Sequence, residues 1–271
     1  MDLARNEISD ISFLKTAKFE KLKILNLSMN NISNYNILEQ VDFKDLKELY
    51  LFSVEISETL DISFLEKVKF EKLEILSLSG NNISNHKILE KVNFKNLKSL
   101  DLSFTKLEDI SFLENVKFEN VELLNLSRNN ILNHRILENV KFNNLKSLYL
   151  NYTKLEDISF LKNVKFENLE ILSLIGNNIS NHRILEKVIF KNLKKLDLKD
   201  TQLEDISFLE NVKFEKLEIL DLSKNNISNH NILGLLENVN FKNLKIIDLN
   251  DNRIINIPVL KMVKIRNILF N

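Results

Sequence analysis

The chain has 271 residues, and its 38 Lys and Arg side chains balance its 38 Asp and Glu side chains, so its formal net charge at pH 7 is zero. A neutral chain creates no global field that would attract DNA, RNA or an anionic membrane, so we expect no nucleic-acid partner. The absence of cysteine excludes disulfides, thiolate metal sites and cysteine nucleophiles. No stretch of about 18 apolar residues could span a bilayer, and the first residues do not resemble a signal peptide. We therefore expect no membrane insertion. The compartment stays open, with the cytoplasm favoured over a bacterial cell surface.

One unit recurs along the chain with the pattern LxxLxLxxNxI. Clear copies are LKILNLSMNNI (residues 22–32), LEILSLSGNNI (73–83) and LEILDLSKNNI (217–227). Ten units follow one another at 24-residue steps, apart from two steps of 27 residues. They begin at Leu22, Leu46, Leu73, Leu97, Val121, Leu145, Leu169, Leu193, Leu217 and Leu244. We expect a single array over residues 1–271 with a partial repeat at each end, which is compatible with a longer parent chain.

The elements of one coil are predicted in chain order. The alternating leucines of LxLxL point inward from a short strand, and successive strands stack in parallel about 4.8 Å apart. The segment that follows, such as DISFLENVKF at residues 109–118, has apolar residues at helical spacing. We expect a short helix there, begun by Ser111 with Glu114 as its capping-box pair. No coil can bury its own apolar face, so the predicted fold class is an α/β repeat solenoid.

These registered copies resemble the leucine-rich-repeat family over nearly the whole chain. The downstream half of the unit, with Asn6, Ile8, Ile11 and Leu14 in NEISDISFL, resembles the internalin and Sds22-like subclass, although most repeats of that subclass are shorter. The resemblance implies a curved horseshoe with a parallel sheet on its concave side. Short helices or irregular turns would lie on its convex side.

Two rows of residues are expected inside the stack. Ten phenylalanines stand three residues before each first leucine and predict an aromatic spine in the core. They are Phe19, Phe43, Phe70, Phe94, Phe118, Phe142, Phe166, Phe190, Phe214 and Phe241. The resemblance also implies a ladder of asparagines that bond the backbone of adjacent turns. Its members would be Asn30, Asn81, Asn129, Asn177, Asn225 and Asn252, partly complemented by Thr105, Thr153 and Thr201. Val54 occupies the same slot beside the insertion SETLD, so we expect its coil to be the least regular.

The true period covers two coils. The residue after each spine phenylalanine alternates in sign, as Glu71, Lys95 and Glu119 do, except that the neutral Asn143 follows Phe142. Equivalent side chains on stacked strands lie within about 5 Å of one another, where opposite charges attract. We interpret the double period as charge matching between neighbouring coils.

The four histidines follow the same double period. His86, His134, His182 and His230 are spaced by 48 residues, and isoleucine occupies the aligned slot in the coils between them. Two histidines would therefore lie about 10 Å apart, whereas zinc holds its ligand nitrogens at about 2.1 Å. We expect half-buried turn histidines, with no metal site and no cofactor.

Candidate functional residues are exceptions to the repeat. No GxGxxG, GxxxxGK[ST], GxSxG or HExxH motif is present, so no catalytic residue is predicted. The outward strand positions are mostly Ser, Asn or Asp, and the departures predict a partner-binding patch, because interfaces favour aromatic residues and arginine. The predicted residues are Tyr50, Phe52, Phe104, Arg128, Tyr149, Tyr152 and Ile175. Arg128 would lie between the rings of Phe104 and Tyr152. Drift in a duplicating array explains these departures equally well.

A second feature of the outward positions is an acidic strip formed by Asp197, Asp221 and Asp248, with Lys199 and Lys224 nearby. A solvated face is the favoured interpretation of that strip. Substitutions in it should matter less for a partner than substitutions of the aromatic residues, and their effect should depend on salt.

We interpret the chain as a protein–protein interaction module that binds another protein on its concave face. The alternative is an architectural spacer or surface stalk without a specific concave ligand, and alanine substitutions on that face, tested against cell extract, would separate the two. The Sds22-like resemblance adds a third hypothesis, a regulatory subunit of an enzyme such as a phosphatase. Pull-down of a catalytic subunit would support it.

Overall fold

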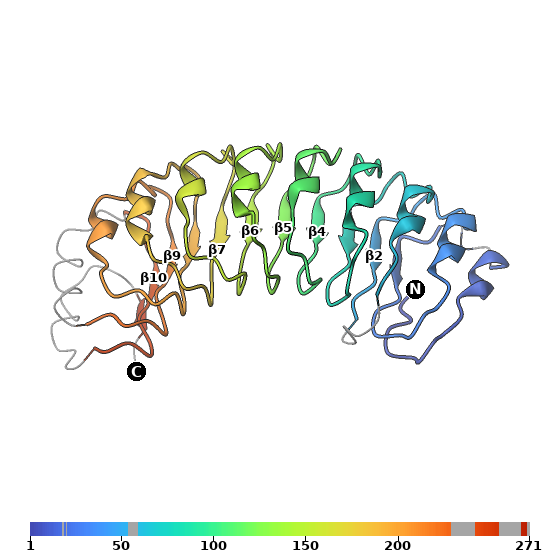
Figure 1. Cartoon of the computed structure of the whole chain (residues 1–271), viewed down its shortest axis with the longest axis horizontal. Coiled ribbons are helices and arrows are strands. Elements are labelled where there is room, and N and C mark those ends of the chain that lie inside the picture. The colour runs from blue at the N-terminus through green and yellow to red at the C-terminus, as the bar shows by residue number, and fades with distance from the viewer. Residues whose placement is uncertain (18, 20, 54–58, 229–241, 255–266, 270–271) are drawn as a thin grey trace. The chain divides into compact units, whose positions relative to one another are not determined.

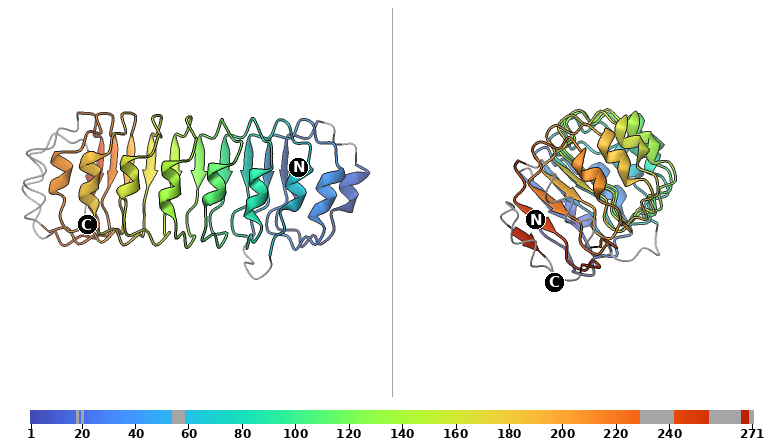
Figure 2. Two further views of the ribbon diagram at one scale, coloured as in Figure 1. Left: turned by 45° about the horizontal axis from the view of Figure 1, so that its top comes forward. Right: turned by 90° about the vertical axis from the view of Figure 1, so that its left-hand side faces the viewer.

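The computed structural model describes residues 1–17, 19, 21–53, 59–228, 242–254 and 267–269 of the chain. It divides the chain into two compact units. Unit 1 comprises Met1–Ile136 and Val140–Asn144, and unit 2 comprises Leu137–Asn139 and Leu145–Asn271. Within each unit the strands follow one side of the coils and short helices follow the other (Figures 1 and 2).

Unit 1 is a stack of coils with one three-residue strand each. The strands are β1 (Ile24–Asn26), β2 (Glu48–Tyr50), β3 (Ile75–Ser77), β4 (Ser99–Asp101) and β5 (Leu123–Asn125). The helices are η1 (Ser12–Lys15), η2 (Tyr35–Gln40), η3 (Ser63–Glu66), η4 (His86–Glu90) and η5 (Ser111–Glu114), while η6 (His134–Glu138) crosses the division between the units. The strands pair in parallel and in sequence order, so that Leu25 faces Leu49 and Leu49 faces Leu76.

Unit 2 repeats this arrangement. Its strands are β6 (Ser147–Tyr149), β7 (Ile171–Ser173), β8 (Lys195–Asp197), β9 (Ile219–Asp221), β10 (Ile246–Asp248) and β11 (Asn267–Leu269). Its helices are η7 (Ser159–Lys162), η8 (His182–Lys187) and η9 (Ser207–Glu210). Each strand pairs in parallel with the next. The predicted repeat solenoid with a parallel sheet is therefore confirmed.

Alternation along the strand decides which side chains enter the core. Leu73, Leu76 and Leu78 are fully buried, while Glu74 and Ile75, which point outward, are half-buried. The spine phenylalanines stack behind the strands, as Phe94 and Phe118 do with ring centroids 6.4 Å apart. All spine members from 43 to 214 are buried, Phe19 is half-buried, and Phe241 lies outside the described residues.

The outer segments that the structure describes are 3-10 helices of four to six residues. In η1 to η5 and η7 to η9 the N-cap residue makes no side-chain hydrogen bond. The prediction for Ser111 was wrong, because the N-cap residue of η5 is Ile110, which makes no side-chain hydrogen bond. Instead, the Asp109 carboxylate accepts hydrogen bonds from the Ser111 backbone N–H (2.8 Å) and hydroxyl (3.0 Å). Asn133 of the next coil donates to the same carboxylate (2.7 Å) and accepts from the Ile110 N–H (3.1 Å). This aspartate–asparagine pair joins two coils at their outer side.

The asparagine ladder crosses the stack as the resemblance implied. Asn129 is buried, and its amide nitrogen donates to the carbonyls of Leu102 (2.8 Å) and Leu126 (2.9 Å). Its oxygen accepts the N–H groups of Thr105 (3.0 Å) and Leu107 (2.9 Å) in the preceding coil. Each such asparagine bonds the backbone of two turns that carry little glycine. Val54 lies outside the described residues.

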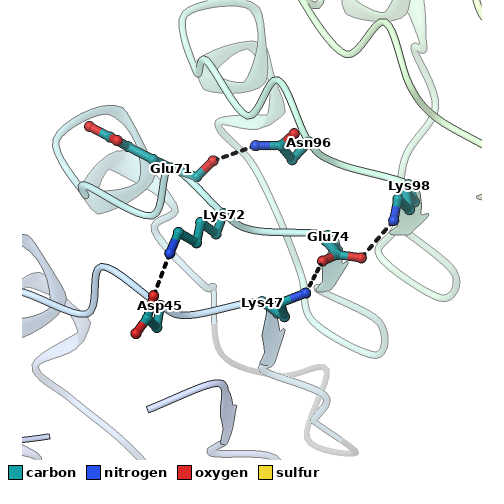
Figure 3. Close-up of polar contacts among 7 residues, drawn as sticks. All are labelled: Asp45, Lys47, Glu71, Lys72, Glu74, Asn96 and Lys98. Carbon is teal, nitrogen blue, oxygen red and sulfur yellow. Dashed lines mark hydrogen bonds and ion pairs between the residues drawn. The ribbon is translucent and has the colours of Figure 1, made fainter. Parts of the chain in front are cut away.

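Ion pairs connect neighbouring coils just before the strands. Glu74 accepts from Lys47 (2.6 Å) on one side and from Lys98 (2.7 Å) on the other (Figure 3). These hydrogen bonds lower the pKa of Glu74 to about 2, and the bond from Lys47 contributes more than the bond from Lys98. The sequence analysis placed the charge matching at the residue after the spine phenylalanine, which is Glu71 in this coil. The ion pairs form three residues later, at Glu74. At that earlier slot it is the Glu71 carbonyl that accepts a hydrogen bond, from Asn96 (2.8 Å).

Candidate functional site

The histidine row was the first candidate site, and its members are built into the packing. His182 is buried, its ring lies 6.3 Å from that of Phe208 in the next coil, and its Nε2 lies 3.2 Å from the Thr201 hydroxyl. In unit 1, His86 packs against Phe112 with centroids 5.1 Å apart. Burial lowers the pKa of His134 and His182 to about 4. His230 lies outside the described residues.

The histidine contacts give the double period a physical cause. In unit 2, Asn181 bonds Asp157 in the coil before it (2.7 Å), while the next residue, His182, contacts Phe208 in the coil after it. Two neighbouring coils therefore present different surfaces to each other, and the pattern repeats only after both.

In the part of the chain that the structure describes, no group of three or more His, Cys, Asp or Glu side chains is arranged to hold a metal ion. No helix of that part has the length and apolar character needed to cross a membrane.

The second candidate site is the outward face of the strands, which the sequence analysis described incompletely. The first outward position of several strands carries an aliphatic side chain that we did not select. These residues are Ile24, Ile75 and Leu123 in unit 1 and Ile171, Ile219 and Ile246 in unit 2. Ile24 is 43% exposed and the others are half-buried. Both faces are therefore more apolar than a row of Ser, Asn and Asp would be.

In unit 1, two predicted residues lie on and beside β2. Tyr50 ends β2 and is half-buried, and its hydroxyl donates to Glu48 (2.8 Å). Burial, together with that carboxylate, raises the pKa of Tyr50 to about 12. The half-buried Phe52 follows the strand, and its ring approaches Gly80 of the next coil so closely that a Cβ there would lie 2.9 Å from it. Tyr50 and Phe52 are two residues apart and both occupy outward positions of this coil.

Phe104 and Arg128 occupy a turn position rather than an outward strand position. Both have left-handed backbone conformations, with φ of 56° and 58°, and Gly80 has 74° in the same slot. Phe104 is 39% exposed, and its N–H donates to the Ser127 carbonyl of the coil that carries Arg128 (2.8 Å). Tyr152, the third residue of this slot in the prediction, belongs to unit 2. The predicted arginine between two rings therefore stays a prediction.

Unit 2 contains the other three predicted residues. Tyr149 ends β6 opposite Ser173 of β7, and Ile175 follows two residues later on the same face. Tyr152 lies in the left-handed turn after β6, with φ of 54°, and is 44% exposed. Its ring covers Gly176 of the next coil, where a Cβ would lie 2.0 Å from the ring carbon Cε1. An aromatic residue and a glycine are thus matched across two coils.

The acidic strip lies on β8, β9 and β10 of unit 2. Asp197 faces Asp221, and Asp221 faces Asp248, in register. Asp197 is only 4% exposed, and its carboxylate lies 3.5 Å from the Lys195 ammonium. Burial and the charge of Asp221 raise the pKa of Asp197. Nothing in the sequence indicated that these carboxylates differ in burial.

The strands and the asparagine ladder form a leucine-rich-repeat fold, and the comparisons with known proteins find proteins that are similar in this respect. The model of the family described as Leucine Rich Repeat matches residues 72–91. A crystal structure of an internalin from Listeria monocytogenes is 26% identical with a TM-score of 0.73, over 98% of this chain and 72% of that chain. The predicted internalin-like assignment is confirmed at this level. No curated protein matches the sequence.

Two other solved structures share the fold alone. A leucine-rich-repeat protein of Leptospira interrogans is 20% identical with a TM-score of 0.59, over 91% of this chain and 72% of that chain. The Arabidopsis receptor kinase HAESA, solved with a peptide hormone and a co-receptor, is 20% identical with a TM-score of 0.65. That match covers 94% of this chain and 42% of the receptor chain.

Proposed function

We propose that the chain binds a protein partner through the outward faces of its strands and does no chemistry of its own. The partner-binding residues would be Tyr50, Phe52, Phe104 and Arg128 in unit 1 and Tyr149, Tyr152 and Ile175 in unit 2. Leucine-rich-repeat proteins are typically non-enzymatic and serve protein–protein interaction. Structures of this fold include plant receptors solved with peptide hormones, which supports a proteinaceous ligand.

The observation that carries the proposal is the placement of aromatic rings at the left-handed turn. A bulky residue with positive φ is uncommon, and here two such rings are also about two-fifths exposed. Asp200 and Lys224 occupy the same slot with φ of 55° and 56°, so the turn does not require an aromatic side chain. Exposing Phe104 and Tyr152 adds solubility risk, whereas a partner could bury them.

The test begins with affinity capture on the full chain and identification of retained proteins by mass spectrometry. Binding of each purified candidate is then measured by calorimetry with Tyr149→Ala and Tyr152→Ala. We expect each change to weaken binding by about 1 to 2 kcal/mol or more, because interface energy concentrates in buried aromatic side chains. Circular dichroism should show an intact fold.

The matched control is Ile189→Ala, since Ile189 is a 65% exposed apolar residue of unit 2 that lies before the spine position and off the strands. It should leave affinity unchanged. A partner whose affinity is unmoved by both tyrosine changes, or lowered equally by Ile189→Ala, would remove the strand face as the binding surface. Failure to retain any specific partner would favour the spacer hypothesis.

A further inference from the structure

The acidic strip of unit 2 has features that a solvated face does not require. Asp197, Asp221 and Asp248 are in register on neighbouring strands, where like charges oppose the pairing. Each carboxylate accepts a backbone N–H two residues further on, from Lys199 (3.3 Å), Ser223 (2.9 Å) and Asn250 (3.0 Å) respectively. These bonds fix the carboxylates without neutralising them.

Two acceptors beside the strip lack a hydrogen-bond donor. The Ser223 hydroxyl and the Asn250 side-chain oxygen are buried and have no partner, and Ser223 as a whole is 2% exposed. Since outward side chains alternate along a strand, both lie on the same face as Asp221 and Asp248. The equivalent slot in unit 1 is satisfied, because the Ser79 and Ser103 hydroxyls bond each other (2.8 Å).

The buried acceptors without a donor lie beside a row of three carboxylates, of which Asp197 has the Lys195 ammonium 3.5 Å away. Such a row suits a ligand that is rich in donors and positively charged. A bare metal ion fits poorly, because within the described residues these carboxylates do not converge into a metal-binding group. An arginine or lysine side chain fits better, since it brings several N–H donors on a flexible stem.

We propose that the face of β8, β9 and β10 binds a basic segment of a protein partner, with its cationic side chains over Asp197, Asp221 and Asp248. This inference rests on the proposed function and names the chemistry of the partner. The three carboxylates span about 10 Å across the strands. Two basic residues at alternate positions of an extended peptide lie roughly 7 Å apart on one side, so both fit within that span.

The neighbours of the buried acceptors indicate which residues a docked segment would contact. Lys199 occupies the slot beside Ser223 in the preceding coil, and a long lysine side chain can change its conformation to admit a donor. On its other side the strip adjoins β7, where Ser173 faces Asp197 and Ile175 lies two residues on. A segment with an apolar residue next to its basic residues would therefore contact both surfaces.

The test uses the full chain and a fluorescent, end-blocked peptide with arginine at two alternate positions. The reference peptide carries glutamine at those positions. Fluorescence anisotropy should show binding of the arginine peptide only, weakened at high ionic strength. Asp221→Asn combined with Asp248→Asn should reduce its affinity at least about tenfold. The matched control is Asp101→Asn, because Asp101 has the same strand slot and the same backbone bond, to Ser103, in unit 1.

Equal binding of both peptides, or an equal loss with Asp101→Asn, would overturn the proposal. Calcium binding that blocks the peptide and vanishes in the double variant would replace it with a metal site. The comparison of peptides on the unaltered chain decides the case even if the double variant fails to fold. Tyr152→Ala should not affect this peptide, which has no apolar anchor. If the tyrosine changes abolish partner binding and the aspartate changes do not, this inference is wrong, while the proposed function still holds.

Discussion

At the residue scale, Asn129 illustrates how the turns are held. Its side chain bonds two carbonyls and two N–H groups in a buried site. We expect Asn129→Ala to lower the free energy of unfolding by about 3 kcal/mol or more, because several buried backbone groups would lose their partners. Urea denaturation measures this. Asn120→Ala removes an exposed bond to the Lys95 carbonyl and should cost no more than about 0.5 kcal/mol. Similar losses in both variants would contradict the ladder's role.

The buried histidines predict acid sensitivity. Burial lowers the folded-state pKa of His134 and His182 to about 4, below the ordinary 6.5, so the unfolded chain takes up protons first as pH falls. Their stabilising effect is therefore complete above pH 6.5 and is lost progressively toward pH 4, by roughly 3 kcal/mol for each histidine. His182→Gln should flatten part of this slope in urea titrations. Glu74→Gln should not, because the pKa of that carboxylate, about 2, acts at lower pH. An unchanged slope in His182→Gln would show that the ring is already protonated or exposed.

Sequence predicts the buried residues well and the turn residues poorly. Leucine and phenylalanine rows follow from alternation and spacing, since an apolar side chain has only one favourable side. The sequence analysis placed Phe104 and Arg128 at outward strand positions, whereas they lie in a left-handed turn. Their residue types do not indicate that backbone conformation. Gly80 and Gly176, which share that slot, are the signal that could have revealed it. The burial of each carboxylate depends on the side chains that surround it in the fold. The repeat pattern of the sequence does not contain that information.

At the scale of elements, strand positions were predictable and the helix type was not. Apolar residues three apart suit both an α-helix and a 3-10 helix, and only the short distance to the next phenylalanine favours the latter. Substitutions at the start of η5 test whether the Asp109 carboxylate or a capping box of Ser111 and Glu114 holds its first turn. We expect Asp109→Ala to destabilise by about 1 to 2 kcal/mol, because it removes bonds to Ser111 and Asn133. Ser111→Ala should cost less, and the reverse order in thermal unfolding would restore the capping box.

At the scale of the whole molecule, stability should be distributed along the stack. Each coil contacts mainly its neighbours, so a defect acts locally. Leu100→Ala removes a fully buried side chain from β4 and should cost about 2 to 5 kcal/mol. Hydrogen exchange should accelerate in β3 to β5 and stay unchanged in β8 to β10. Leu196→Ala in β8 should give the opposite pattern, and uniform acceleration in both variants would indicate one cooperative unit.

A further prediction from the sequence concerns the stability of the coil that contains Val54. Asn81 of the next coil donates to the Leu51 carbonyl (2.7 Å), so the ladder reaches the edge of that coil. Val54→Asn should stabilise by about 0.5 to 1.5 kcal/mol for each hydrogen bond gained. Destabilisation in urea would mean that the insertion shifts the register there.

The alternating outer contacts restrict how such a chain can change its length. Asn133 reaches back to Asp109, and the residues that follow Asn85 and Asn181 pack forward onto a phenylalanine, as His86 does onto Phe112 and His182 onto Phe208. Deleting 24 residues would place two like coils together, with an aspartate lacking its asparagine and a histidine facing no ring. Deleting 48 residues, the spacing of the histidines, would rejoin unlike coils. Duplication and loss of this gene segment should therefore proceed in cassettes of two coils, and designed variants shortened by one cassette should fold where those shortened by half a cassette do not.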